Sequence, residues 1–514
     1  MPRPIPRRRS SVPAEGGRYR FPPLERRGVI AGIGANQLAV AAGGCLVAFF
    51  VLQLVSGVAG VGLAVALVAA TAAGACWHVR GLTPGGWAPI AAAWLRRRAA
   101  GQPQLSDIPG VGTTLAGPPR AAPPRALVGV SIASAPEVPG SPPMGVVRDV
   151  KAGTLAAMLA VHGRSFSLLD PTEKQRRLDA WGTVLAGLCR EGSPVHRLQW
   201  LERAMPGERD GLRRYLEDCG RRSGPDTADR PDAAHDSYRE LITTAGPVGQ
   251  AHASLVILAI HIRKANRSSR AFGRGPGAAC GVLRRELRLL QGQLRQAELT
   301  VDRVLAAPEV AAAVRAGFDP ATTSGEAGGA MASGARHPAS ERALVWPTAT
   351  DEEWGALRAD GSWHVTYWVA EWPRIDVGSD FLSPLLLTVA GCRAASVVMA
   401  PVPPGRAARE AEAARTADMA DEKLRQKAGF LTTARRQRQA EGVLRRESEL
   451  ADGHAEYRYS GYVTVSAASL ADLEVSCAEI EQAAHQSNLE LRRLYGQQAE
   501  AFTWTLPLAR GLKS

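Results

Sequence analysis

The longest apolar run of the chain, residues 28–79, reads GVIAGIGANQLAVAAGGCLVAFFVLQLVSGVAGVGLAVALVAATAAGACWHV. These fifty-two consecutive residues contain no Asp, Glu, Lys or Arg, and Arg27 and Arg80 bound the run on either side. A helix of about 20 apolar residues crosses the hydrocarbon core of a bilayer, so the run is long enough for two crossings. We expect two transmembrane helices, near Ala35–Leu54 and Val58–Trp77, joined by a short turn.

Two other interpretations of the apolar run fit the sequence less well. A secretory signal peptide contains an apolar region of only about 7–15 residues, far shorter than this run. A hairpin buried in a protein core is the plainer alternative, but the absence of charge over the whole run and the Arg at both ends favour a membrane. Inside the second helix, Ala66, Ala70 and Gly74 recur every four residues, and this small-residue spacing lets transmembrane helices approach closely.

The charges beside the apolar run predict its orientation. Residues 1–27 contain eight Arg and two Glu, and residues 80–127 contain six Arg and one Asp. Short flanks rich in Lys and Arg stay cytoplasmic, so we expect both flanks, both termini and the rest of the chain on the cytoplasmic side of the cell membrane. The arginines that flank the membrane are Arg26, Arg27, Arg80, Arg96, Arg97 and Arg98.

The formal net charge of +13 is unevenly distributed. Eleven of these charges lie in the first 127 residues, where anionic lipid would attract them. The 387 residues that follow carry only +2, whereas a nucleic-acid-binding domain has a basic patch of its own. We therefore expect no direct nucleic-acid binding. The seven Cys are scattered without a CxxC pair, which favours reduced thiols over disulfides or a metal site.

The part of the chain after the membrane run is long enough for two or three folded units, at about 150 residues per domain. Stretches rich in Pro, Gly, Ala and Ser mark the boundaries. The sequence predicts a basic cytoplasmic N-terminus at 1–27, a transmembrane hairpin at 28–79, a basic, Pro- and Gly-rich linker at 80–143, an α+β subdomain at 144–321, a flexible loop at 322–340, and a second α+β subdomain at 341–514 that contains a long helical hairpin.

Strand and helix patterns alternate twice after the linker, which predicts a membrane-anchored α+β protein with strands packed on long helices. Val195–Ala204 alternates apolar and polar residues, so we expect a strand with one buried face. Trp363–Trp372 carries aromatic residues on both faces, which predicts a central strand. Ala278–Leu305 predicts one long amphipathic helix. Residues 403–450 predict two charged, antiparallel helices that break near Gly429.

Motifs for common reaction chemistries are absent from the sequence. A P-loop needs Gly-Lys-Ser/Thr because the Lys must reach the outer phosphates, and none of the six Lys follows a Gly. The sequence has no GxSxG or SxxK for a nucleophile and no HExxH for zinc. We expect no enzymatic activity, no cofactor and no metal.

Two stretches carry a family resemblance. The first is Tyr367-Trp368-Val369-Ala370-Glu371-Trp372-Pro373, followed by Phe381-Leu382-Ser383-Pro384-Leu385-Leu386. It resembles a strand and helix of the N-terminal, non-hydrolytic domain of conjugative type IV secretion ATPases of the TrbE/CagE type. The second, Ala501-Phe502-Thr503-Trp504-Thr505-Leu506-Pro507-Leu508, is similar to the segment that leads into the ATPase domain of that family. This chain stops there, so the resemblance does not extend to ATP hydrolysis.

The Arg-flanked hairpin resembles the small PrgI-like inner-membrane subunit that accompanies this ATPase. The whole chain is similar to actinobacterial conjugation-associated membrane proteins with the same layout. The residues that carry the cytoplasmic resemblance are Tyr367, Trp368, Glu371, Trp372, Pro373, Phe502, Leu506 and Pro507.

The resemblance implies a non-enzymatic, membrane-anchored scaffold of a type IV secretion or conjugation-like machine. Such a scaffold would dock a separately encoded ATPase and neighbouring copies of itself, through the helices around Arg406–Arg446 and through Phe502–Leu508. An EccE-like core component of a type VII secretion system is an alternative, because its anchoring subunit also places two helices before a cytosolic α+β domain. A membrane-tethered enzyme that uses Asp, Glu or His is a third hypothesis. The sequence leaves open the number of subunits and whether DNA or protein is transported.

Overall fold

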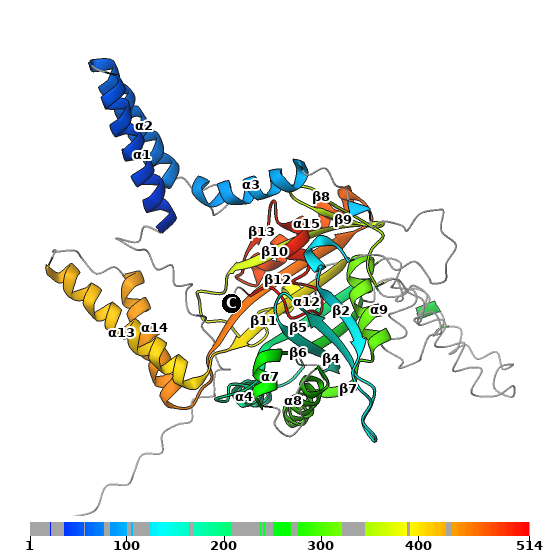
Figure 1. Cartoon of the computed structure of the whole chain (residues 1–514). Coiled ribbons are helices and arrows are strands. Elements are labelled where there is room, and N and C mark those ends of the chain that lie inside the picture. The colour runs from blue at the N-terminus through cyan, green and yellow to red at the C-terminus, as the bar shows by residue number, and fades with distance from the viewer. Residues whose placement is uncertain are drawn as a thin grey trace, which may run out of the picture.

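The computed structural model describes most of the chain after residue 34. The described residues are 21, 35–55, 57–76, 83–99, 104–105, 123–163, 166, 168–206, 237, 240–241, 250–268, 276–320, 345–387, 391–427 and 434–512. Two helical hairpins project from a body built around one large sheet (Figure 1).

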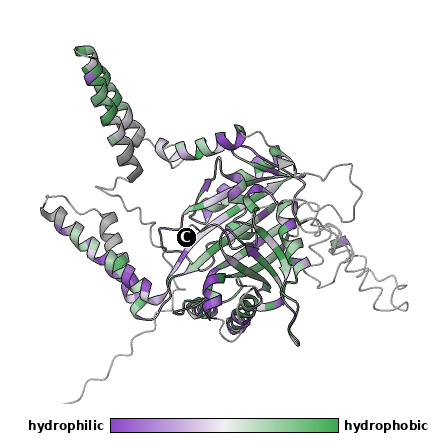
Figure 2. Cartoon of the chain, in the orientation of Figure 1, coloured by the Kyte–Doolittle hydropathy of each residue, from purple (hydrophilic) through white to green (hydrophobic). Residues whose placement is uncertain are grey.

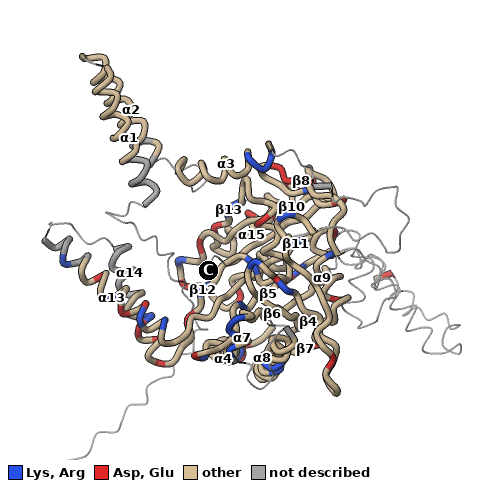
Figure 3. Tube along the Cα trace, in the orientation of Figure 1, with Lys and Arg blue, Asp and Glu red and all other residues tan. Residues whose placement is uncertain are grey.

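The first hairpin coincides with the apolar run. Helix α1 (Ala35–Leu54) and helix α2 (Val58–Cys76) lie against each other and stand clear of the body (Figure 1). Their contact is made by small residues, with Ala48 and Ala64 buried between the helices. Figure 2 shows that the described residues of the hairpin are mostly hydrophobic, and Figure 3 shows no Lys, Arg, Asp or Glu on its described part. The large exposed side chains are Leu46, Val47, Phe49, Phe50, Leu52, Leu54, Val58, Val61, Leu63, Val65 and Val68.

No helix within the described residues qualifies as a membrane span by length and hydropathy together. Side chains are described in α1 only from residue 42 onward. The two helices and the turn between them agree with the expected residue ranges, whereas their insertion into a membrane stays a prediction.

The contacts described between α1 and α2, which leave out the side chains of α1 before residue 42, do not involve the small-residue stripe predicted on α2. Ala66 and Ala70 are exposed, and a Cβ added at Gly74 would meet nothing within 4 Å. The helices instead meet at Gly44, where a Cβ would collide with the side chain of Thr71.

The described strands form one 13-stranded sheet. Its main order is β1-β8-β9-β10-β12-β11-β5-β6-β4-β3-β2, with β13 beside β10 and β7 beside β4. The first half of the body contains β2 (Val130–Ser134), β3 (Gly145–Asp149), β4 (Thr154–His162), α4 (Pro171–Leu188), β5 (Val195–Pro206), β6 (Gln250–His261), α7 (Ile262–Ser268), α8 (Pro276–Gln296), β7 (Thr300–Val304) and α9 (Ala307–Phe318).

The second half has a similar order of elements, with α13 and α14 inserted between β11 and β12. It contains β8 (Ala349–Glu352), β9 (Leu357–Ala359), β10 (Ser362–Glu371), α12 (Ser383–Leu387), β11 (Cys392–Pro401), α13 (Pro404–Lys427), α14 (Ala434–Ala451), β12 (Tyr457–Ala467), α15 (Leu470–Gln486), β13 (Glu490–Arg493) and α16 (Gln498–Phe502).

Each half is a βαββαβ unit of the ferredoxin-like type. In the first half the strands lie in the order β7-β4-β6-β5, and in the second half in the order β13-β10-β12-β11, with all pairs antiparallel. The two units join edge to edge, because β5 pairs with β11 from Leu198↔Met399 to Ala204↔Arg393. The eight strands of the two units are therefore arranged symmetrically about the β5–β11 pair.

Helices and the C-terminal segment cover the two faces of the sheet. We call the face under α4, α8, α12 and α15 the helical face; its buried side chains include Leu198, Leu258, Leu283, Val465 and Ile480. We call the opposite face the tail face, because α9 and the C-terminal segment cover it. The α+β class is confirmed, and β10 is central as expected, with β12 on one side and β9 and β13 on the other.

Three expectations about individual elements are wrong. The helix expected over Ala278–Leu305 ends at Gln296, and after a turn in which Glu298 has a φ of 59°, residues Thr300–Val304 form β7 along β4. Residues 80–143, expected as a linker, contain α3 (Pro84–Ala99), β1 (Gln104–Leu105) and β2. Strand β5 is buried on both faces, because the C-terminal segment covers the polar face that we expected in solvent. The expected break at Gly429 and the loop at 322–340 lie outside the described residues.

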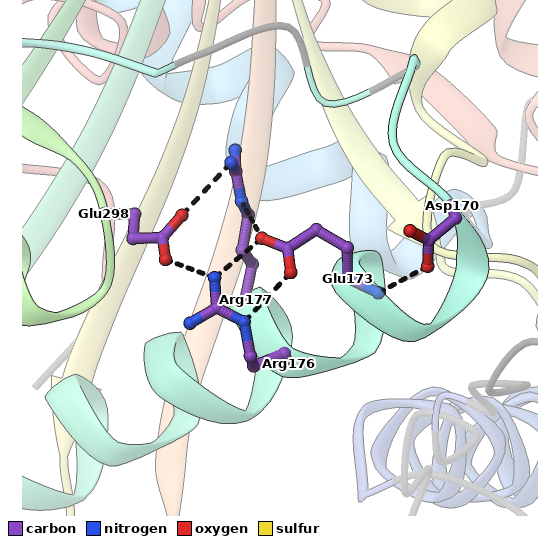
Figure 4. A network of polar contacts seen from close by, with 5 residues as sticks. All are labelled: Asp170, Glu173, Arg176, Arg177 and Glu298. Carbon is purple, nitrogen blue, oxygen red and sulfur yellow. Dashed lines mark hydrogen bonds and ion pairs between the residues drawn. The ribbon is translucent and has the colours of Figure 1, made fainter.

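An ion-pair network fixes α4 to the turn that precedes β7 (Figure 4). Asp170 caps α4 by accepting from the backbone N–H of Glu173 at 2.9 Å, and Pro171 occupies the first position of the helix. The Glu173 carboxylate accepts from Arg176 at 2.7 Å and from Arg177 at 3.2 Å, and Arg177 reaches Glu298 at 3.1 Å. The hydrogen bond from Arg176 is the main reason that the pKa of Glu173 falls to about 2.

This network predicts a pH-dependent contribution to stability. Because the pKa of Glu173 is lower in the folded chain, its contribution is complete above the ordinary value of 4.5 and disappears as the pH falls towards 2. Glu173→Gln should therefore lower the urea midpoint of the detergent-solubilised chain at pH 7, and its difference from the unsubstituted chain should shrink between pH 4.5 and pH 2. The effect should weaken in high salt. Glu479→Gln on the exposed face of α15 is the control, and a difference that stayed constant with pH would contradict the network's role.

Candidate functional site

The C-terminal segment lies across the tail face, over the junction between the two halves. We call residues 498–512, which comprise α16 and the chain after it, the tail. Phe502 stacks against Phe318 of α9 and His364 of β10, with ring centroids 5.0 and 4.6 Å apart. Leu506 is fully buried. The segment Phe502–Leu508, expected as a surface for a partner, is thus packed inside this chain and is not exposed for docking.

Polar side chains of β5 hold the tail in place. Gln199 is fully buried, and its Nε2 donates to Leu506 O at 2.9 Å and to the Ser396 hydroxyl of β11 at 2.8 Å. Its Oε1 accepts from the backbone N–H of Ala509 at 2.7 Å. Arg197 donates to the carbonyls of Ala509 and Leu512, so one strand fixes several tail residues at once.

Tail and first half are also joined by a buried ion pair. Arg510 approaches Asp149, the last residue of β3, at 2.7 Å. Burial alone would raise the pKa of Asp149, but Arg510 and the backbone N–H of Ala152 lower it overall. The carboxylate is therefore charged at neutral pH and pairs with the tail.

A chain of hydroxyl groups continues the polar layer under the tail. The hydroxyls of Thr366 and Thr464 lie 2.8 Å apart, and those of Thr464 and Thr505 lie 2.7 Å apart. The Thr505 hydroxyl donates to the carbonyl of Phe502 at 3.0 Å. Since each hydroxyl has one proton, Thr464 donates to Thr505, and Thr366 donates to Thr464.

The buried His364 is a neutral member of this layer. Burial lowers the pKa of His364 to about 4. Its Nε2 lies 3.1 Å from the carbonyl of Phe318, which can only accept, so Nε2 carries the proton. Its Nδ1 therefore accepts from the Ser466 hydroxyl at 2.8 Å. The donors of the layer are directed at the tail, α9 and one another, and this arrangement serves to hold the tail on the sheet.

The motif on β10 is divided between the two faces of the sheet. Tyr367 is buried on the helical face, and its hydroxyl donates to Glu481 of α15 at 2.8 Å. Trp368 lies on the tail face, where its Nε1 donates to the Ser460 hydroxyl at 3.0 Å. The adjacent Thr366 binds the tail, since its backbone N–H donates to Gln498 Oε1 at 2.8 Å. The structure thus brings the strand of the first motif and the tail of the second into contact.

The end of the β10 motif contacts the N-terminal flank. Glu371 forms an ion pair with Arg374, and Pro373 is buried. Trp372 stacks on Phe21, with ring centroids 5.3 Å apart, and Phe21 also lies 5.4 Å from the ring of Phe381. The flank that precedes the apolar hairpin is therefore placed against the body.

Helix α3 attaches the other flank to the part of the sheet formed by β8 and β9. Figure 1 shows that α3 runs from the base of the α1–α2 hairpin across the body. Trp87 and Trp94 pack on Trp354, at 6.0 and 5.2 Å between ring centroids. Arg97 forms an ion pair with Glu352 of β8 at 3.3 Å and donates to the carbonyl of Gly496. Both flanks of the hairpin thus contact the same folded body.

The structure describes three of the six arginines that were expected beside the membrane. Arg96, Arg97 and Arg98 form the exposed end of α3, and Arg98 lies over the ring of Trp94. Arg26, Arg27 and Arg80 lie outside the described residues.

The second projecting hairpin consists of α13 and α14. Ala407, Ala411 and Ala414 form its buried stripe, and Arg415 pairs with Glu447 across the two helices at 2.7 Å. At the base, Glu410 accepts from Arg458 of β12 at 2.9 Å, which fixes the hairpin to the sheet. Arg409, Glu412, Ala413, Thr416, Ala417 and Ala420 line a shallow exposed groove on α13.

Several residues of the polar layer were not singled out by the sequence. Arg197, Gln199 and Arg203 alternate with apolar residues along β5, which is the usual pattern of a solvated face. These residues are buried only because the tail, more than 290 residues later in the chain, covers them, and Gln199 then forms hydrogen bonds with the tail backbone. Within the described part of the chain, no group of three His, Cys, Asp or Glu side chains is placed to hold a metal ion.

No protein-family model matches the chain, and no curated protein matches it.

The Gln199 contacts predict a large effect of a near-isosteric substitution. Gln199→Leu keeps the approximate volume of the side chain but leaves the N–H of Ala509 buried without its acceptor, and it removes one of the two donors to the carbonyl of Leu506. Each unsatisfied buried group costs about 1–3 kcal/mol. The free energy of unfolding, measured by urea denaturation in detergent, should fall by at least about 2 kcal/mol. Gln482→Leu, on the exposed face of α15, should change it by less than about 0.5 kcal/mol; equal effects would contradict the tail contacts.

The docking of α3 predicts protection from trypsin at Arg96, Arg97 and Arg98. Trp354→Ala removes two aromatic contacts worth about 1–2 kcal/mol together. The undocked population of α3, and with it the cleavage rate in this helix, should then rise by a factor of about 5–30. Leu95→Ala, on the exposed side of α3, should leave the rate unchanged. A rate that did not respond to Trp354→Ala would contradict docking of α3 on the body.

Proposed function

We propose that this protein is a membrane-anchored, non-enzymatic scaffold of a bacterial type IV secretion or conjugation-like machine. In this proposal the α1–α2 hairpin is the membrane anchor, and the body lies on the cytoplasmic side. The body docks a separately encoded ATPase and assembles with further copies of the same chain. The observation that carries the proposal is the anchor-like hairpin with both of its flanks attached to one folded body.

The surface of the hairpin supports the anchor. Its described outer side chains include many large apolar residues that are exposed, and the hairpin stands clear of the body (Figure 1). Such a surface is unfavourable in water and suits hydrocarbon. The helices contain no charged residue. The exposed Arg96, Arg97 and Arg98 lie at the end of α3, the helix that follows the apolar run.

The contacts of the two flanks support the proposed topology. A helical hairpin returns the chain to the side from which it started. Phe21 before the hairpin contacts Trp372, and α3 after it contacts Trp354. Because both flanks touch the body, the body and the basic flanks share one side of the proposed membrane. Basic flanks favour the cytoplasmic side.

The α13–α14 hairpin is the proposed docking surface for the ATPase. It stands clear of the sheet (Figure 1), and it leaves Met419 and Leu444 exposed among charged side chains. Since the tail is buried, α13–α14 is the remaining one of the two surfaces expected from the sequence. The groove on α13 is lined by the small side chains of Ala413, Ala417 and Ala420 beside Arg409 and Glu412, which suits close approach of a partner's helix.

Photocrosslinking in the native cell tests this docking. A benzoylphenylalanine placed at Ala413 should capture a secretion ATPase of the type IV class, and the same probe at Val138, exposed on the body away from the hairpin, should not. The detergent-solubilised chain should also be oligomeric by native mass spectrometry. Capture of an FtsK-like ATPase at Ala413 would instead support a type VII role. A monomeric chain that captured no ATPase at Ala413 would contradict the scaffold function.

A further inference from the structure

A small cavity lies on the tail face, at the point where β5 and β11 meet α9 and the tail. It has room of about 20 Å³, enough for one particle the size of a water molecule. Its lining includes Arg203, Gly317, Thr464, Ser466 and Thr505, and no Asp or Glu. The cavity is distinct from the proposed docking surface on α13–α14.

Arg203 is a buried cation with unused donors in this cavity. Its side chain is 4% exposed, and its Nη1 donates to the carbonyl of Ala313 in α9. Nε and Nη2 have no hydrogen-bond partner among the described residues. Burial lowers the pKa of Arg203 to about 10, so the guanidinium still carries its charge at neutral pH. A buried charge that lacks a counter-charge is strongly unfavourable.

The other polar groups of the cavity are already engaged. Thr464 donates to Thr505, which donates to the carbonyl of Phe502. Ser466 donates to His364. The second arginine of the lining, Arg393, donates to Gln250 at 3.1 Å and to a carbonyl of α12. Among the polar groups that line the cavity, Nε and Nη2 of Arg203 are therefore the donors without an acceptor in the described part of the chain.

The absence of a side chain at residue 317 keeps the cavity open. A Cβ at Gly317 would lie 3.0 Å from Nη2 of Arg203 and 2.4 Å from Cδ2 of Leu506. Any larger residue would fill the space beside the guanidinium. The sequence thus combines an unpaired buried cation with a glycine that leaves room next to it.

We propose that this cavity binds one monatomic anion, chloride in the cell, through Nε and Nη2 of Arg203. A single anion supplies both the missing acceptor and the missing negative charge, whereas a water molecule would supply only the acceptor. The room favours a halide over a larger oxyanion such as sulfate. Bound there, the anion neutralises the cation that touches α9, β5 and the tail, and so stabilises the junction of the two halves.

Thermal unfolding of the full chain in detergent tests the anion site. At constant ionic strength, replacing sodium gluconate by sodium chloride or bromide should raise the Tm by about 2–4 °C for each tenfold increase in halide above its Kd. Arg203→Met should abolish the dependence on halide. Arg445→Met, an exposed arginine of α14, should retain it. Sulfate should not substitute for chloride.

Crystals grown in bromide provide a measurement that does not depend on a variant that folds. The expected result is an anomalous peak within hydrogen-bond distance of Nε and Nη2 of Arg203. A Tm of the unsubstituted chain that is the same in chloride, bromide and gluconate would overturn the proposal, and so would bromide crystals without a peak at Arg203.

Discussion

The body depends on the antiparallel pairing of β5 with β11, which joins two ferredoxin-like units into one sheet. Edge strands that remain open invite pairing with other chains. Here the edge strands β5 and β11 of the two units pair with each other. The tail covers this junction, and its backbone forms hydrogen bonds with Gln199 of β5. Packing of the tail in turn buries Phe502 against Phe318 and His364, so the end of the chain completes the core of both halves.

The symmetry of the two units also explains where the α13–α14 hairpin is inserted. In each unit the connection between the second and third strands of the βαββαβ motif carries an insertion, residues 207–249 between β5 and β6 and residues 402–456 between β11 and β12. In the second half this insertion is the α13–α14 hairpin. The antiparallel sheet is therefore kept, while one loop between strands carries the α13–α14 hairpin. Functional elements are commonly added to a fold as insertions in such loops.

Local sequence signals predicted the elements whose pattern is self-contained. The helix Ala35–Leu54 agrees with expectation because the uncharged run spans it without a break. The α+β class and the central position of β10 follow from apolar and aromatic strands. These signals lie within single elements, so they need no knowledge of distant parts of the chain.

Signals that depend on distant partners were missed. The polar residues of β5 indicated a solvated face, because nothing in residues 195–204 shows that Leu506 and Ala509 will cover them. Strand β7 was assigned to the preceding helix, since its pairing partner β4 lies about 140 residues earlier. The duplication of the βαββαβ unit is visible only in the strand order. The motif on β10 and the tail were singled out separately from the sequence, and their contact with each other was not expected.

The central claim is that the α1–α2 hairpin crosses a membrane twice while the body stays on the cytoplasmic side. Labelling of intact cells with a membrane-impermeant maleimide tests it, in a background in which Ala replaces the exposed Cys45 and also Cys76 and Cys219, whose side chains lie outside the described part of the structure. Val58→Cys at the turn of the hairpin should react in intact cells, and Leu168→Cys, exposed on the body, should react only after lysis. Reaction of Leu168→Cys in intact cells, or protection of both positions until lysis, would contradict the account.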